Sequence, residues 1–254
     1  MIDKIFGACI RNIPSTEKVL YLTFDDGPHE HCTPKVLHLL SHHHVHATFF
    51  VVAETLRRNL SLGHSIVAHG HNVGNHSLDH KYHYFFLNDR YLMNWVGQAR
   101  DFIEQALQVQ TIGFRSPLGI RTPHLGMALR ELQYPLVHWN QRFFDTWRGL
   151  PRTVVLKVIP QFQSGDILLL HDTHIKYQRS FLEGLELLLT QAQHEGFIFK
   201  SIPDNLFPFS LRIPAPSLPI SGETKEYIGS SVVDNDDRIL PDSLEPALPP
   251  KGPL

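Results

Sequence analysis

The stretch Tyr21-Leu22-Thr23-Phe24-Asp25-Asp26-Gly27-Pro28 is an apolar strand that ends in two adjacent carboxylates and a Gly-Pro turn. Two acids at the end of a buried strand are costly unless an opposite charge lies beside them, and a metal ion commonly supplies that charge. Because side chains alternate along a strand, Asp25 and Asp26 can face one site only if the chain turns there, which Gly27-Pro28 permits. The alternative interpretation is a turn in which an Asp caps a helix that begins near Thr33-Pro34.

Strands and helices alternate along the chain after this stretch. The patterns predict strands at 19–24, 46–52, 71–76, 112–115, 135–139, 166–171 and 197–200. They predict helices near 33–41, 55–69, 89–108, 121–132, 151–161 and 177–195. This repetition indicates an α/β protein with a parallel sheet. About seven strands in roughly 185 residues fit a distorted (β/α)7-type barrel, one unit short of the eight-fold design, with active residues at the carboxyl ends of its strands.

Composition excludes several classes of function. The chain has 254 residues, of which 42% are hydrophobic, enough for one large domain. Its formal net charge of −2 offers no basic field for nucleic acid. No run reaches the ~18 apolar residues of a membrane span. The apolar patch at 5–10 is too short for a signal-peptide core, which predicts a cytoplasmic protein, while the oligomeric state stays open.

Proline divides the chain into three expected segments. Residues 1–17 form a lead-in, and residues 18–200 form the folded domain. More than half of the 18 prolines lie in residues 201–254. Because a packed helix or a central strand does not tolerate that density, we expect an extended or disordered tail there.

Histidine is concentrated in the first third of the chain. Most of the 18 histidines lie between His29 and His83, which favours a metal site in that region. His76 and His80 have i, i+4 spacing, so their imidazoles meet on one face if the segment makes a helical turn. With a carboxylate from elsewhere they would form a two-histidine, one-carboxylate site, the arrangement of catalytic zinc. The spacing alone is not specific for metal.

Three later strand ends also carry polar residues. Arg115 ends an apolar run, and its guanidinium can hold a carboxylate; the alternative is a solvated arginine in a surface turn. Asp145 lies in the aromatic segment 139–147. The alternative interpretation of this segment is a packed loop without a functional role. His171 ends the buried run 167–170, where its alternative role is that of a structural hydrogen-bond donor.

Taken together and in this order, the motifs resemble the polysaccharide deacetylase family with the NodB homology domain, carbohydrate esterase family 4. The resemblance spans about residues 18–200. It rests on five segments: Thr23 to Gly27, His76 to His80, Arg115 to Gly119, the segment around Asp145, and Leu169 to Asp172. It implies a NodB-like fold and a metal-dependent hydrolase that removes N-acetyl groups from the amino sugars of a poly- or oligosaccharide.

The resemblance implies a role for each residue of the first motifs. The metal would be a divalent ion, most readily Zn²⁺ with Co²⁺ possible, held by Asp26, His76 and His80. Asp25 would be the catalytic base, steadied by Arg115. The partner would be an N-acetylated glycan or amino sugar.

The later motifs imply the remaining site residues. His171 would be the general acid, oriented by Asp145. Leu118, Leu169 and Trp147 would line the substrate pocket. Leu118 stands where the family commonly has an aromatic residue, and one residue separates Asp145 from Trp147 where the family pattern has adjacent residues.

Two other functions stay open. The first is a deformylase or deacylase of a lipid-linked sugar on the same fold. The assignment of Asp26 as a metal ligand, beside a complete set of acid and base residues, favours deacetylation over this first alternative. The second is a non-catalytic barrel that binds carbohydrate or metal, against which the presence of Asp25 and His171 argues.

Overall fold

The computed structural model describes residues 8–173 and 176–204 of the chain. Apart from residues 201–204, the expected tail lies outside the described residues, as does the start of the expected lead-in. Within these ranges no helix has the length and apolar character needed to cross a membrane.

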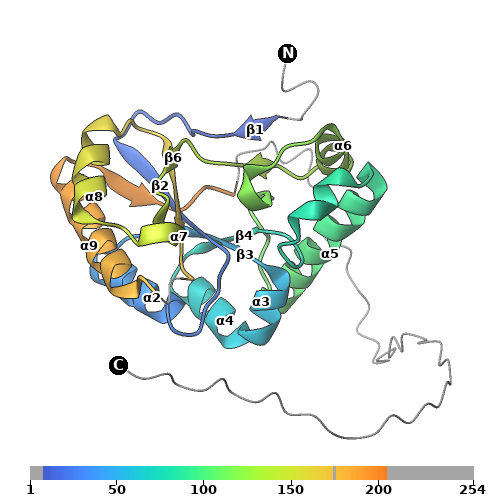
Figure 1. The fold of residues 1–254 in the computed structure, drawn as a ribbon, viewed down its shortest axis with the longest axis horizontal. Helices are drawn as coiled ribbons and strands as arrows, with labels where there is room; N and C mark the ends of the chain where they lie inside the picture. Colours follow the sequence, from blue (N-terminus) through green and yellow to red (C-terminus); the bar gives the residue numbers. More distant parts are fainter. Residues whose placement is uncertain (1–7, 174–175, 205–254) are drawn as a thin grey trace, which may run out of the picture. The chain divides into compact units, whose positions relative to one another are not determined.

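The sheet is built around β2 (Val19–Asp25), which is buried along its whole length. On one edge β2 pairs in parallel with β7 (Asp166–His171). On the other edge its first residues pair with β8 (Ile198–Lys200) and its last residues with β3 (Thr48–Val51), again in parallel (Figure 1). A parallel sheet is covered on both faces, which explains why these strands are nearly continuous apolar runs.

Shorter pairings lead around the molecule and back to β2. β4 (Asn72–Asn75) pairs with β3, and Phe114 bridges from Asn75 to Leu136. Leu136 begins β5 (Leu136–Val137), which pairs with β1 (Cys9–Ile10). The same segment continues into β6 (Gln141–Arg142), which pairs with β7. The expected distorted parallel barrel is confirmed in this form, although the strand expected at 112–115 is reduced to the single residue Phe114, which bridges to Asn75 on one side and to Leu136 on the other.

Helices surround the strands (Figure 1). The α-helices are α2 (Thr33–His42), α3 (Ala53–Arg58), α4 (Leu60–Ala68), α5 (Asp89–Leu107), α6 (Pro123–Glu131), α7 (Asp145–Arg148), α8 (Arg152–Val158) and α9 (Gln178–His194). The described residues also contain three short 3₁₀ turns: η1 (Tyr82–Phe86), η2 (Pro117–Gly119) and η3 (Ile159–Gln161). The single helix expected at 55–69 is wrong, because Asn59 leaves the helical conformation and separates α3 from α4.

Side chains alternate along β2, so those on its two faces pack into two different hydrophobic clusters. The outward side chains pack in the cluster under the helices: Leu20, Leu22 and Phe24. The inward side chains of Val19 and Tyr21 belong to a second cluster that includes Phe50 of β3. The next two inward positions are Thr23 and Asp25. The inward face of β2 is therefore apolar at the start of the strand and polar at its carboxyl end.

Candidate active site

Asp25 and Asp26 face one site because the backbone leaves the strand conformation at Asp26, directly after the end of β2. Asp25 is the last residue of β2 and is 2% exposed. Asp26 has a φ of 73°, a left-handed conformation that breaks the alternation of the strand. Gly27 follows, and a Cβ there would lie 2.2 Å from Asp172 Oδ1. The helix-capping interpretation is wrong, since α2 has Cys32 at its N-cap and no side-chain hydrogen bond there.

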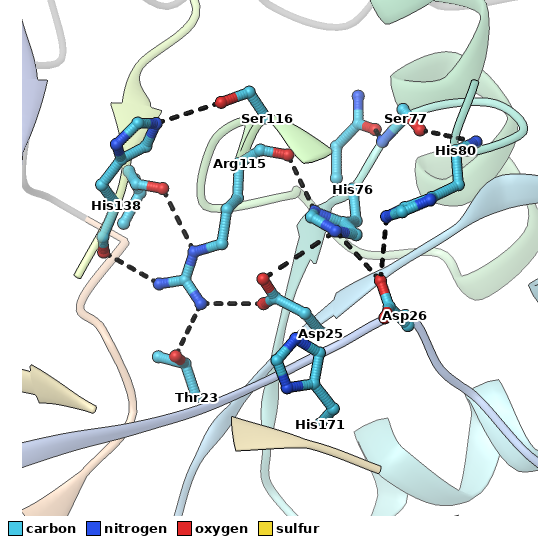
Figure 2. Close-up of polar contacts among 12 residues, drawn as sticks. Thr23, Asp25, Asp26, His76, Ser77, His80, Arg115, Ser116, His138 and His171 are labelled. Atoms are coloured by element: carbon cyan, nitrogen blue, oxygen red, sulfur yellow. Dashed lines mark hydrogen bonds and ion pairs between the residues drawn. The ribbon is translucent and has the colours of Figure 1, made fainter. Parts of the chain in front are cut away.

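Asp26, His76 and His80 bring three possible ligand atoms together (Figure 2). His76 Nε2 and His80 Nε2 each lie 3.2 Å from Asp26 Oδ1. All three ligand atoms lie within 4.8 Å of one another. Asp26 Oδ1 is buried and accepts no well-formed hydrogen bond from the described residues. A buried carboxylate oxygen that faces two imidazole nitrogens without such a bond fits a divalent cation.

The two histidines meet through a loop and not through a helical turn. Ser77 has a φ of 83° and His80 a φ of 58°, so the chain from 76 to 80 is not helical. The ring centroids of His76 and His80 are then 5.2 Å apart. Local bonds replace those of a helix, because Ser77 N donates to Asn75 Oδ1 at 2.8 Å and His80 N donates to Ser77 Oγ at 3.0 Å.

The protonation of this group suits metal binding. His76 Nδ1 lies 2.9 Å from the carbonyl oxygen of Arg115. Because a carbonyl only accepts, Nδ1 carries a proton, which leaves Nε2 as the nitrogen that faces Asp26. Burial raises the pKa of Asp26, but contacts with His76 and His80 outweigh it and hold that pKa well below its usual value. Asp26 is therefore a carboxylate, as a ligand must be.

Arg115 is fully buried and holds Asp25. Its Nη1 donates to Asp25 Oδ1 at 2.8 Å and to Thr23 Oγ1 at 2.6 Å. Its Nε and Nη2 donate to the carbonyl oxygens of Val137 and His138 at 3.2 and 3.0 Å. The interpretation of Arg115 as a solvated surface residue is wrong. Burial lowers the pKa of Arg115, while the charge of Asp25 raises it and favours the charged pair.

Asp145 holds His171 on the strand beside Asp25. His171 ends β7 and is in register with Asp25 of β2. Asp145 is fully buried, and its Oδ2 accepts from His171 N at 2.8 Å while its Oδ1 lies 3.0 Å from His171 Nδ1. Burial lowers the pKa of His171, but the hydrogen bond and charge of Asp145 outweigh it and raise that pKa to about 9. At neutral pH the imidazole is a charged donor.

The three expected pocket residues lie in different surroundings. Leu169 lies two residues before His171 on β7, so it shares the inward face, and it is 2% exposed. Leu118, with a φ of 57°, is 61% exposed in η2, and Trp147 is 80% exposed in α7. Only Leu169 is enclosed, while Leu118 and Trp147 present their side chains to the surface.

Sequence reasoning missed two residues that shape the site. Thr23 Oγ1 accepts from Arg115 and donates to the carbonyl oxygen of Leu168 at 2.7 Å. Its spacing of two from Asp25 was an available signal. His138 is buried, and its Nε2 lies 3.1 Å from Ser116 Oγ. Burial first and the charge of Arg115 second lower the pKa of His138 to about 3, so it is neutral. No spacing pattern pointed to His138.

Comparison with known proteins gives consistent matches. A family profile described as polysaccharide deacetylase matches residues 12–137. The chain is 30% identical over 202 residues to a peptidoglycan-N-acetylglucosamine deacetylase of Bacillus cereus, covering 76% of this chain and 91% of that protein. It is 31% identical over 196 residues to a chitooligosaccharide deacetylase of Sinorhizobium fredii, covering 73% of this chain and 91% of that protein.

Solved structures share the fold. A peptidoglycan N-acetylglucosamine deacetylase superposes with a TM-score of 0.72 at 25% identity, covering 80% of this chain and 93% of that one. A carbohydrate esterase family 4 pseudoenzyme from Bacillus anthracis superposes with a TM-score of 0.69 at 25% identity, covering 77% of this chain and 67% of that one.

Proposed function

The chain belongs to the polysaccharide deacetylase family, carbohydrate esterase family 4, and we propose that it hydrolyses the N-acetyl amide of amino sugars in a poly- or oligosaccharide. One observation carries this proposal. Three residues that could bind a metal, a carboxylate paired with arginine and an imidazole paired with aspartate converge where β2, β4 and β7 end.

Asp26, His76 and His80 are the residues that would hold the cation. Two imidazole nitrogens and one carboxylate oxygen match the ligands of catalytic zinc, and three protein ligands leave open positions. When bound, such a cation lowers the pKa of a water and polarises the acyl carbonyl. Zinc is the ion we assign, and cobalt is its nearest substitute.

Asp25 is placed to accept the proton of the attacking water. Arg115 binds its Oδ1, and its Oδ2 lies 3.8 Å from His76 Nε2, so the free oxygen faces the triad. The buried ion pair with Arg115 fixes the carboxylate in this orientation. A base held within reach of the reacting proton is the arrangement that general base catalysis requires.

His171 is placed to protonate the departing amine. Its Nδ1 is bound to Asp145, so Nε2 is the nitrogen left to meet substrate. In the proposed hydrolysis the water oxygen bonds to the acyl carbon, the C–N bond breaks, and the amine takes up a proton from His171. An amine is a poor leaving group until it is protonated, which gives this step its importance. Leu169, buried beside His171, is positioned to wall the acyl group.

Similarity to a pseudoenzyme raises the second candidate, a barrel that binds glycan without catalysis. The described chain retains a paired base and a paired acid beside the metal triad. A binding protein has no need of a histidine charged at neutral pH or of a carboxylate held by a buried arginine. The arrangement therefore favours the enzyme.

The test is a product assay on the zinc-loaded protein. Peptidoglycan, chitin oligomers and a lipid-linked N-acylated sugar are each incubated with the wild type and with the control Asp25→Asn. We expect acetate from at least one N-acetylated glycan and none above background with the control. Formate as the only product would indicate a deformylase. No acid release together with glycan binding would indicate the non-catalytic barrel.

A further inference from the structure

His80 is less supported than His76, the other candidate histidine ligand. His76 is fixed through its Nδ1 by the carbonyl oxygen of Arg115. Among the described residues, by contrast, no hydrogen bond reaches His80 Nδ1, and the His80 side chain is 35% exposed. Its direction therefore depends on the backbone of the loop that carries it.

Asp79 ties down the residues on both sides of His80. Its side chain is only 6% exposed. Asp79 Oδ1 accepts from Trp95 Nε1 at 2.9 Å and from the backbone N of Lys81 at 3.4 Å, while Oδ2 pairs with Lys81 Nζ at 2.9 Å. Asp79, the residue before the ligand, thus binds Lys81, the residue after it, and the same carboxylate is bound to Trp95 of α5.

Helix α5 holds the loop at both ends. Trp95 is 3% exposed, and the rings of Tyr84 and Phe85 pack against it edge to face at 5.6 and 5.5 Å between centroids. The next residue, Val96, accepts from Asn75 Nδ2 at 3.0 Å. Consecutive residues of one helix therefore fix the start of the loop at Asn75 and its end at Asp79.

The loop needs such support. His80 has a left-handed φ of 58°, which costs free energy for a residue with a Cβ and persists only when its surroundings enforce it. Without the bond from Trp95 to Asp79, the chain on both sides of His80 is free to relax toward commoner conformations. Its Nε2 would then leave the position 3.2 Å from Asp26 Oδ1.

We propose that Asp79 and Trp95 are positioning residues for the metal site: the bond from the indole N–H to the carboxylate holds His80 in the conformation that directs its Nε2 at Asp26. The proposal rests on the assignment of Asp26, His76 and His80 as metal ligands. Neither residue touches the metal or the substrate, so their effect is on metal affinity.

The test measures zinc affinity of the purified full chain by competition with a chromophoric chelator. Trp95→Phe keeps an aromatic ring against Tyr84 and Phe85 but removes the N–H donor. We expect zinc affinity to fall by about tenfold or more, the usual effect of removing an outer partner of a metal ligand. Asp79→Asn keeps an oxygen acceptor for the indole and should retain more affinity than Asp79→Ala.

Two controls separate positioning from general loosening. Lys81→Met removes the ion pair of the exposed Lys81 ammonium with Asp79 but keeps the backbone and indole bonds to that carboxylate, so it should lower zinc affinity by much less than Trp95→Phe does. Leu92→Ala opens a cavity under the same helix without touching Asp79 and should lower the melting temperature while zinc affinity stays near wild type. Equal losses of affinity in Leu92→Ala and Trp95→Phe would overturn the proposal.

The variant His80→Ala distinguishes the positioning role of Asp79 and Trp95 from the metal assignment on which that role rests. If His80→Ala loses zinc while Trp95→Phe binds it like the wild type, the positioning role alone is wrong. If His80→Ala binds zinc like the wild type, the metal assignment is wrong and the positioning role fails with it.

Discussion

At the scale of single residues, adjacent carboxylates are given different partners. Asp25 is paired with an arginine that no solvent reaches, and Asp26 faces two imidazoles. The left-handed φ of Asp26 makes this division possible, because two consecutive strand residues otherwise point to opposite faces. In the proposed mechanism this division leaves one carboxylate to accept a proton while its neighbour binds the cation.

The buried pair of Arg115 and Asp25 makes a stability prediction. Arg115→Met leaves the Asp25 charge buried without its partner, which should cost about 3–5 kcal/mol in the free energy of unfolding. The double variant Arg115→Met, Asp25→Asn removes that charge and should recover part of the loss. Urea unfolding of the metal-free proteins measures both. Additive losses in the double variant would show that the two residues are not coupled.

The pair of Asp145 and His171 makes a pH prediction. The pKa of His171 is raised from 6.5 to about 9, so its charged acid form, and the stability it contributes, are complete below pH 6.5 and lost as pH rises through about 9. Turnover should therefore fall above about pH 9. Asp145→Asn removes the largest cause of the raised pKa, so the alkaline limb of the rate profile should move to lower pH. An alkaline limb that stays in place in this variant would show that it reports another group.

At the scale of elements, the sequence predicted the positions of the active-site residues better than the backbone conformations that hold them. In a parallel α/β fold the polar residue that ends a strand lies at the active edge, and Asp25 and His171 followed that rule. The i, i+4 spacing of His76 and His80 suggested a helical turn, but left-handed residues in a loop bring the rings together. The strand expected at 112–115 is reduced to Phe114, which makes one bridge on each side. Such features depend on distant partners that local patterns do not record.

The break between α3 and α4 makes a prediction at this scale. Asn59 Nδ2 donates to the carbonyl oxygens of Thr55 and Pro28, at 3.1 and 3.3 Å, and so ties the kink to the turn after Asp26. Asn59→Ala loses both bonds and should lower the free energy of unfolding by about 1 kcal/mol. Asn59→Asp keeps the size of the side chain but not the donor, and should behave like the alanine variant. Thermal unfolding of both variants measures this, and wild-type stability in either would contradict it.

At the scale of the whole molecule, the parallel pairings around β2 bring distant segments to one site. Asp26, His80, Arg115 and His171 come from four separate parts of the chain. Alternation along strands predicted this convergence, because inward positions at neighbouring strand ends must face one another. His138 and the tautomer of His76 were beyond prediction, since each is set by a hydrogen bond from a segment far away in sequence.

We propose that the catalytic domain, which contains β1 as well as residues 18–200, works without help from the proline-rich end. Proline density argues against helix or central strand after residue 201. Removing residues 215–254 should therefore change the melting temperature and zinc affinity little. A large loss in either, measured by calorimetry and chelator competition against the full chain, would show that this segment supports the domain.

The most direct test of the account compares Asp25→Asn with Asp26→Asn by zinc titration and acetate release from the same glycan. Asp25→Asn keeps the shape of the side chain but not its basicity, so it should bind zinc like the wild type and lose about 10²–10⁴-fold in kcat. Asp26→Asn removes a charged ligand and should lose zinc first. Equal loss of zinc in both variants, with Asp25→Asn regaining activity in excess zinc, would contradict the roles assigned to this pair.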